Sequence, residues 1–179
     1  MAISEKIRLL LLTLLLAPLT SAAWDPQDQG KEDKQAAETI AKFKEKDKGI
    51  QRFFKSAYGY AVFPTVGKGG FGIGGAYGKG QVYQRGKLIG SAKLTQVTIG
   101  LQLGGQAYSE IIFFQDKTAM ERFKESKLEL SAQASAVAIT AGASADANYE
   151  SGVAVFTLAK GGLMYEASVG GQSFSFTPN

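Results

Sequence analysis

A run of closely spaced glycines, residues 58–80, constrains this chain more than any other feature. Glycine stands at roughly every second or third position, yet the run also carries large apolar residues such as Phe71, Ile73 and Tyr77. A flexible linker lacks apolar groups of this size. The pattern is typical of strands that approach a neighbour too closely for a side chain, or that bend at bulges. It predicts a tightly curved sheet.

The N-terminus is predicted to be a cleavable secretory signal peptide. Lys6 and Arg8 precede an apolar run over residues 9–16, and small residues end this segment at Ala23. The apolar run is too short to span a bilayer, although an anchor that stays in place is the alternative interpretation. We expect cleavage after Ala23 and export, with the periplasm as the destination.

Three segments follow from this interpretation. Residues 1–23 form the signal peptide, the polar residues 24–34 form a flexible segment, and residues 35–179 form one domain. A domain of this length is large enough to bury a core of its own.

The chain contains no cysteine and no histidine. This composition excludes disulfides, the Ser-His-Asp and Cys-His nucleophile systems, and zinc sites built from the usual ligands. A Ser-Lys or two-carboxylate mechanism stays formally open, but no motif supports one. The sequence therefore predicts a non-enzymatic protein without a metal site or cofactor.

Two helices are expected near the start of the domain, Lys34–Asp47 and Ile50–Ala57. Apolar residues recur there with a helical period, Asp47 is the odd member of their stripe, and Gly49 interrupts it. A third helix should open at Thr118 with a capping box and run to about Ser126.

The rest of the domain has the period of strands. Val97 is expected to face the core with Ile99, Leu101 and Leu103, and residues 107–114 read as a central strand that is apolar on both faces. A hairpin turn is expected at residues 85–87. Further strands are expected at residues 131–140, 153–158, 163–169 and 172–176, around a polar loop at 142–151, with pairing broken at Pro178.

The stretch Lys42–Lys55 combines basic and apolar residues. On one continuous helix, its apolar groups would enter a lipid headgroup layer while its cations meet anionic lipid. The competing interpretation is that the apolar groups pack on the sheet and the lysines are an ordinary solvated face. The residues assigned to lipid contact are Lys42, Lys44, Lys48, Arg52, Lys55, Phe43, Ile50, Phe54 and, in the glycine-rich run, Lys68.

Two other patterns were weighed for chemistry. Residues 67–72 match G-x-G-x-x-G, but the helix and the acidic residue that a dinucleotide site requires do not follow. Glu110 is an acid within the apolar residues 108–114. A buried carboxylate needs a partner, and Lys93 or Arg85 could supply one, so a structural ion pair is expected rather than a general base.

Several ordered motifs resemble the SYLF domain family. They span about Ala36 to Pro178 and comprise Ala57–Val66 (AYGYAVFPTV), Lys68–Gly78 (KGGFGIGGAYG), Thr98–Gln106, Glu110–Phe114, Gly152–Phe156, Lys160–Met164 and Gly170–Gln172. The resemblance implies a compact β-rich domain with helical N-terminal elements. It also implies binding to anionic lipids, phosphoinositides in animal and fungal members, and to actin in fungal relatives. In some members an N-terminal amphipathic helix makes the lipid contact, and by position this is Lys42–Lys55.

These observations converge on one expectation. The fold should be α+β and mainly β, with a curved antiparallel sheet (barrel-like or sandwich), N-terminal helices and one inserted helix. The expected function is peripheral association of an exported domain with an anionic lipid or membrane surface, without nucleic acid. The chain lacks the SH3 or FYVE modules of eukaryotic relatives, and export makes cytoplasmic actin an unexpected partner. A periplasmic carrier of an apolar small molecule and a protein-interaction module with an unknown partner are the alternatives.

Overall fold

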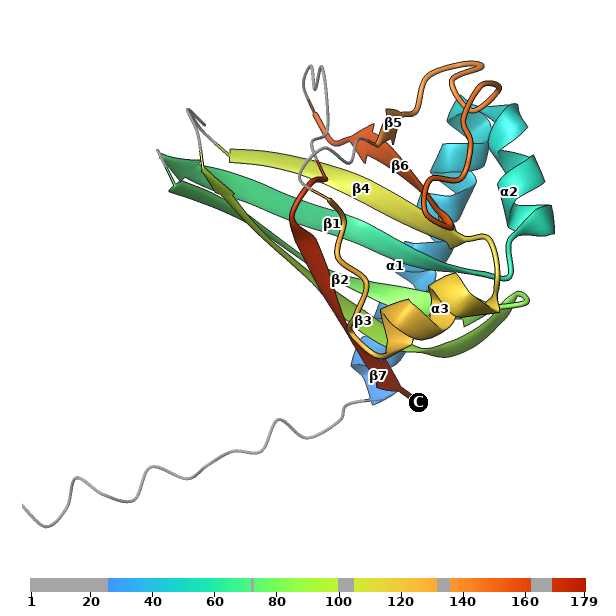
Figure 1. The fold of residues 1–179 in the computed structure, drawn as a ribbon, viewed down its shortest axis with the longest axis horizontal. Helices are drawn as coiled ribbons and strands as arrows, with labels where there is room; N and C mark the ends of the chain where they lie inside the picture. Colours follow the sequence, from blue (N-terminus) through green and yellow to red (C-terminus); the bar gives the residue numbers. More distant parts are fainter. Residues whose placement is uncertain (1–25, 72, 100–104, 132–135, 162–168) are drawn as a thin grey trace, which may run out of the picture.

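The computed structural model describes residues 26–71, 73–99, 105–131, 136–161 and 169–179. The described strands form one curved, open sheet in the order β5-β6-β4-β1-β2-β3-β7 (Figure 1). Every neighbouring pair is antiparallel except the short parallel pair β5–β6. The expected mainly-β α+β class is confirmed. The elements are α1 (Pro26–Lys46), η1 (Lys48–Ile50), α2 (Gln51–Ser56), β1 (Gly59–Phe71), β2 (Ile73–Gln84), β3 (Lys87–Ile99), β4 (Gly105–Phe114), α3 (Lys117–Lys124), β5 (Val137–Ala138), β6 (Val153–Ala159) and β7 (Gln172–Pro178).

The glycine-rich run forms β1 and β2, and both predicted reasons for its composition are confirmed. A β-carbon on Gly80 would lie 2.4 Å from the carbonyl oxygen of Val62, so only glycine lets β2 lie this close to β1. The register of β1 shifts between Val62 and Thr65, around Pro64, which has no N–H to donate. The shift is a bulge that bends the strand.

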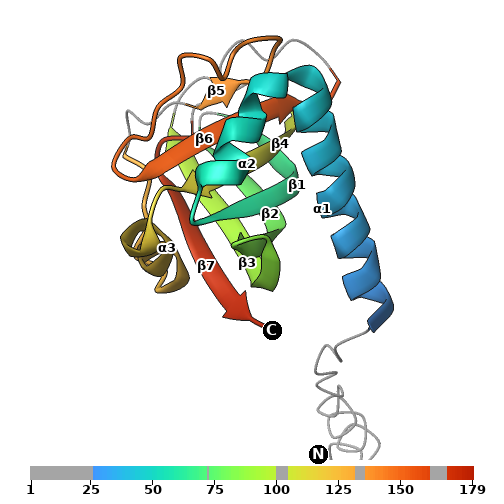
Figure 2. The same ribbon diagram turned by 90° about the vertical axis from the view of Figure 1, so that its right-hand side faces the viewer.

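The central strand β4 sends alternate side chains into two cores. Ile111 and Phe113 enter the α1-side core, whereas Ile112 and Phe114 enter the α3-side core, as expected for a strand apolar on both faces. Figure 2 shows α1 and α3 on different sides of the sheet. The α1-side core consists of Ala36, Phe43, Ile50, Phe53, Val62, Ile111, Phe113, Ile139, Ala147, Ala154 and Phe156. The α3-side core includes Phe63, Val66, Leu94, Tyr108, Ile112, Phe114, Met120, Phe123 and Phe174.

The two expected N-terminal helices are present, but the first is longer than predicted. Helix α1 begins at Pro26 rather than near Lys34, so the part of the polar segment from Pro26 onward is helical. Proline suits the first helical position because its fixed φ angle is already helical and its missing N–H would have no partner there. The Asp33 carboxylate also accepts a hydrogen bond from Gln81 on β2, which fastens this half of the helix to the sheet.

The inward face of β3 is opposite to the one predicted. Ala92, Leu94 and Gln96 are buried, whereas Val97 is 74% exposed. The alternation itself is correct, but its phase is set by the contacts of Leu94 in the α3-side core. Ile99 is the last residue of β3, and Leu101 and Leu103 lie outside the described residues.

The C-terminal part differs from prediction in its boundaries. The cap of α3 is Asp116, whose carboxylate accepts from the Ala119 N–H at 2.9 Å, so the expected capping box at Thr118 is wrong. Within the described part of the strand expected at 131–140, β5 is present, while residues 132–135 lie outside the described residues. The strand expected at 163–169 lies almost wholly outside them. Strands β6 and β7 are present. Pro178 pairs with Gly90, which β7 tolerates as an edge strand.

The hairpin turn predicted at residues 85–87 is confirmed. Strand β2 ends at Gln84 and β3 begins at Lys87. Arg85 and Gly86 both have positive φ angles, 49° and 77°, as a tight two-residue hairpin requires.

Candidate functional site

The cations of the N-terminal helices lie at one end of α1 and along α2, and we call them the basic edge. Four of the five predicted there, Lys42, Lys48, Arg52 and Lys55, are exposed. Lys44 is half-buried, with its Nζ 4.5 Å from the centre of the Phe54 ring. The exposed Lys46 also belongs to the basic edge, whose members are therefore Lys42, Lys44, Lys46, Lys48, Arg52 and Lys55.

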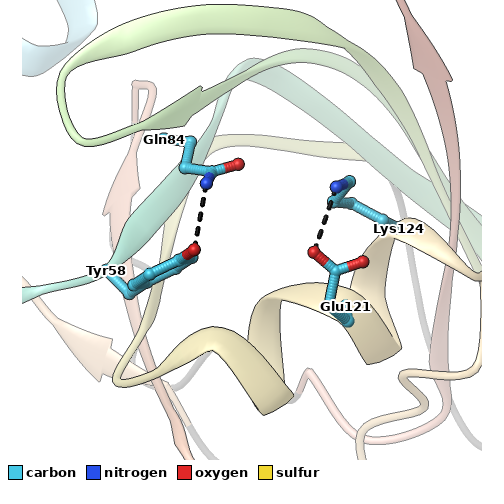
Figure 3. Close-up of polar contacts among 4 residues, drawn as sticks. All are labelled: Tyr58, Gln84, Glu121 and Lys124. Carbon is cyan, nitrogen blue, oxygen red and sulfur yellow. Dashed lines mark hydrogen bonds and ion pairs between the residues drawn. The ribbon is translucent and has the colours of Figure 1, made fainter.

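The basic edge has no ion pair with an acid among the described residues. The ion pairs recorded there join Lys124 to Glu121 at 3.1 Å within α3, and Lys127 to Glu125 at 2.6 Å just after it. Figure 3 shows the first of these pairs. Two of the lysines in and after α3 are thus paired with nearby acids, whereas Lys42, Lys46, Lys48 and Lys55 of the basic edge are exposed and form no such pair among the described residues.

The apolar residues assigned to lipid contact do not point outward. Phe43 and Ile50 are fully buried in the α1-side core. Phe54 is half-buried, and its ring meets Phe113 at 4.8 Å and Tyr60 at 5.2 Å, edge-on. This placement corrects the expectation of insertable side chains, because withdrawing a buried aromatic would cost about 3–5 kcal/mol.

Asp47 occupies a structural position that sequence reasoning missed. It is buried between α1 and η1, and its two carboxylate oxygens accept from the N–H groups of Gly49 (2.8 Å) and Ser144 (2.6 Å). Burial raises the pKa of Asp47, but these amide donors lower it more, so the net shift is downward. The signal was present in the sequence, since an acid within an apolar stripe is a candidate buried cap.

Arg52 fastens the same loop from the other side. Its Nη2 donates to the carbonyl oxygens of Ser144 (2.7 Å) and Ala147 (2.5 Å), and its guanidinium lies 4.6 Å from the centre of the Phe53 ring. A guanidinium held by carbonyls and an aromatic face is less available to lipid than a solvated ammonium group. Arg52 therefore belongs to the basic edge by position but has a structural role.

Lys68 is not brought together with the basic edge. It is a half-buried residue of β1, two positions after Val66 and therefore on the α3 side of the sheet. Burial lowers its pKa, while the charge of Glu110 raises it. The structure thus groups Lys68 with Glu110.

Glu110 is completely buried, and its expected partners are wrong. Its Oε2 accepts from Gln172 Nε2 at 3.0 Å, and the same amide group donates to the Tyr108 hydroxyl at 3.2 Å. Burial is the main cause that raises the pKa of Glu110 to about 8, although the Gln172 hydrogen bond and the charge of Lys68 both lower it. The carboxyl is therefore largely protonated near neutral pH, so it needs no ion pair.

The two cations proposed for Glu110 lie elsewhere. Lys93 is exposed on β3. Arg85 lies in the hairpin turn with its guanidinium 5.3 Å from the centre of the Tyr58 ring. The Tyr58 hydroxyl in turn accepts from Gln84 Nε2 at 3.1 Å (Figure 3). Sequence alone did not reveal Gln172, because the contact joins residues that are far apart along the chain.

The comparisons with known proteins bear on this arrangement. Residues 95–178 match the family Ysc84, described as Las17-binding protein actin regulator. Beta cell expansion factor A of Aeromonas veronii is 28% identical over 123 residues, which cover 68% of this chain and 46% of that protein. The chain thus spans about half the length of this relative. None of the helices among the described residues is long and apolar enough to cross a bilayer.

The family match begins within β3 and ends in β7, so the basic edge lies outside it. Together with the motifs that precede it along β1 and β2, the match confirms the resemblance inferred from the sequence. Residues 95–178 of this chain thus match the Ysc84 (SYLF) family.

Proposed function

We propose that this protein is a non-enzymatic domain that associates peripherally with anionic membrane surfaces through the solvated lysines of its basic edge. The match of residues 95–178 to the SYLF family, a family of binding domains linked to lipid or actin binding, supports this class of function. Export, predicted from residues 1–23, places the proposed contact outside the cytoplasm.

One observation carries the proposal. The lysines of the basic edge are without acidic partners among the described residues, while the apolar side chains between them are packed against the sheet. The contact we propose is therefore electrostatic adhesion rather than insertion of an amphipathic helix. Each lysine near an anionic surface contributes on the order of 1 kcal/mol, and salt screens this contribution.

Co-sedimentation with vesicles tests the proposal. More of the full chain should pellet with phosphatidylcholine vesicles that contain phosphatidylglycerol than with pure phosphatidylcholine, and added salt should remove this difference. Replacing Lys46, Lys48 and Lys55 together by Gln should weaken binding at low salt by about tenfold or more. These three are chosen because none of them holds the fold together through a recorded contact.

The matched control removes the same charge elsewhere. A triple variant with Gln at the exposed positions Lys87, Lys93 and Lys117 should retain most of the binding. All variants share one N-terminus, so any contribution from the apolar residues 9–16 cancels. Equal pelleting with neutral and anionic vesicles, or equal losses in the two triple variants, would contradict the proposal.

A further inference from the structure

Two adjoining hollows lie between α1 and the sheet. The smaller, of about 160 Å³, is lined by Lys42 and Glu38 of α1, Thr65 and Pro64 of β1, Ser109 of β4, and Lys160. The larger, of about 310 Å³, shares Pro64 and Thr65 with it and continues along β2 past Tyr77. Figure 2 shows α1 running along this side of β1 and β2. We call the two hollows together the α1 groove.

The bulge in β1 builds the floor of the groove. The register shift at Pro64 frees its carbonyl from the ladder, and the Ser109 hydroxyl donates to that oxygen at 2.8 Å. The same shift brings Thr65 to the side of the sheet that α1 covers. Lys160, directly after β6, is fixed by its backbone N–H, which donates to Ala107 at 2.9 Å.

Lys42 and Lys160 both line the smaller hollow, and Glu38, which lines it too, forms an ion pair with neither of them. Lys160 Nζ donates to Thr65 Oγ1 at 2.5 Å, and neither Lys160 nor Lys42 forms an ion pair with a described residue. Burial lowers the pKa of Lys160, and so does the positive charge of Lys42. The like charges of two lysines that line one hollow destabilise each other, so an anion between them would interact favourably with both.

The chemistry of the hollow favours phosphate. Two lysines act as point charges for an anion that carries more than one negative charge, and the hydroxyl of Thr65 can donate to its oxygens because it accepts from Lys160. The neighbouring hollow is lined by Gly67, Gly78 and Gly80 and by Tyr77, which is 48% exposed. Backbone and an aromatic ring can receive the organic part of the same ligand.

We propose that the α1 groove binds a phosphate-bearing ligand, with the phosphate between Lys42 and Lys160 and the organic part toward Tyr77. The inference rests on the proposed function where the phosphate belongs to a lipid headgroup, and stands alone where it belongs to a soluble ligand. Glu38 and Glu32 on α1 also line the groove and oppose an anion, which supplies a test of the opposite sign.

Two probes separate the sources of phosphate. In the first experiment, inorganic phosphate is titrated into the full chain at constant ionic strength, and calorimetry measures the heat of binding. Phosphatidylcholine vesicles containing phosphatidic acid present the same group in a lipid. Lys160→Met and Lys42→Met should weaken binding to a probe by about tenfold or more, since each removes one of the charges in the hollow. Lys46→Met, which changes the same charge on α1 outside the groove, should change the affinity for inorganic phosphate less than about twofold.

Glu38→Gln should tighten phosphate binding, because it removes a negative charge from the groove. A gain of affinity cannot come from misfolding, and thermal melts check that the lysine variants are folded. Binding of either probe with the predicted order of variants supports the site, and the probe that binds identifies the source. Absence of saturable binding to both probes, or equal losses in Lys46→Met and Lys160→Met, would overturn it. Adhesion to phosphatidylglycerol vesicles without saturable binding of either phosphate probe rejects the site alone, whereas phosphate binding without such adhesion rejects only the membrane proposal.

Discussion

The two cores on either side of the sheet differ in how they treat charge. In the α1-side core, Phe113 lies among Phe53, Phe54 and Phe156, with ring centres 4.8–5.7 Å away. The lysines of the covering helices stay outside it. On the α3 side of the sheet, by contrast, Glu110 of the same strand β4 is completely buried. One strand thus feeds an apolar core on one face and a core with an ionisable group on the other.

The comparison indicates what each face is suited to do. The aromatic side chains of the α1-side core pack against one another, and the lysines lie outside them in solvent. These lysines can therefore bind a charged partner without any rearrangement of the core. A core that encloses a carboxyl is more stable when that carboxyl is protonated than when it is charged. We therefore expect the α1 side to carry surface binding, and the α3 side to make the stability of the fold depend on pH between about pH 4.5 and 8.

The largest effect is expected for Phe113→Ala. Truncating this fully buried ring should lower the free energy of unfolding by about 3–5 kcal/mol and loosen α2 from the sheet. Urea denaturation measures the first effect and near-ultraviolet circular dichroism the second. Phe114→Ala is the matched control, because it empties the α3-side core instead and should leave α2 in place. A cost below about 1 kcal/mol for Phe113→Ala would show that aromatic packing does not close the α1-side core.

Glu110→Gln should have the next largest effect, and its sign depends on pH. The folded state raises the pKa of Glu110 from 4.5 to about 8, so the protonated group contributes stability that is present below about pH 4.5 and is lost as the pH rises toward 8. The neutral amide in Glu110→Gln removes this loss. Denaturation curves should be close for the two proteins near about pH 5 and diverge by on the order of 3–4 kcal/mol near pH 8, with the variant more stable. Parallel pH profiles would contradict the buried protonated carboxyl.

Asp47→Asn should have the smallest effect. The native carboxylate has a lowered pKa, so its contribution is present above about pH 4 and is lost as the pH falls through the lowered value. The amide keeps one acceptor oxygen and loses the other, which should cost about 1 kcal/mol at neutral pH and reduce the sensitivity to acid. Asp146→Asn, an exposed acid of the same loop, is the control and should change little. An Asp47→Asn protein as stable as the native one would mean that the loop is held by Arg52 alone.

The local features of this fold were predictable because they depend on nearby residues. Closely spaced glycines between apolar residues predicted strands in close contact. The structure confirms this at Gly80, where β1 leaves no room for a β-carbon. The break between α1 and α2 and the hairpin at Arg85–Gly86 follow from the same kind of local signal. The basic composition of Lys42–Lys55 was equally plain.

Only the tertiary structure decided which side each pattern faces and which distant residues meet. A period of two cannot say whether Val97 or Gln96 turns inward, because a shift of one residue reverses both without changing the alternation. A helical stripe likewise does not show whether Phe43 meets lipid or β4. The contacts of Glu110 with Gln172, and of Lys160 with Thr65, join residues with no local relation. Chain folding creates such contacts, so composition determined the kinds of groups available and three-dimensional packing determined their partners.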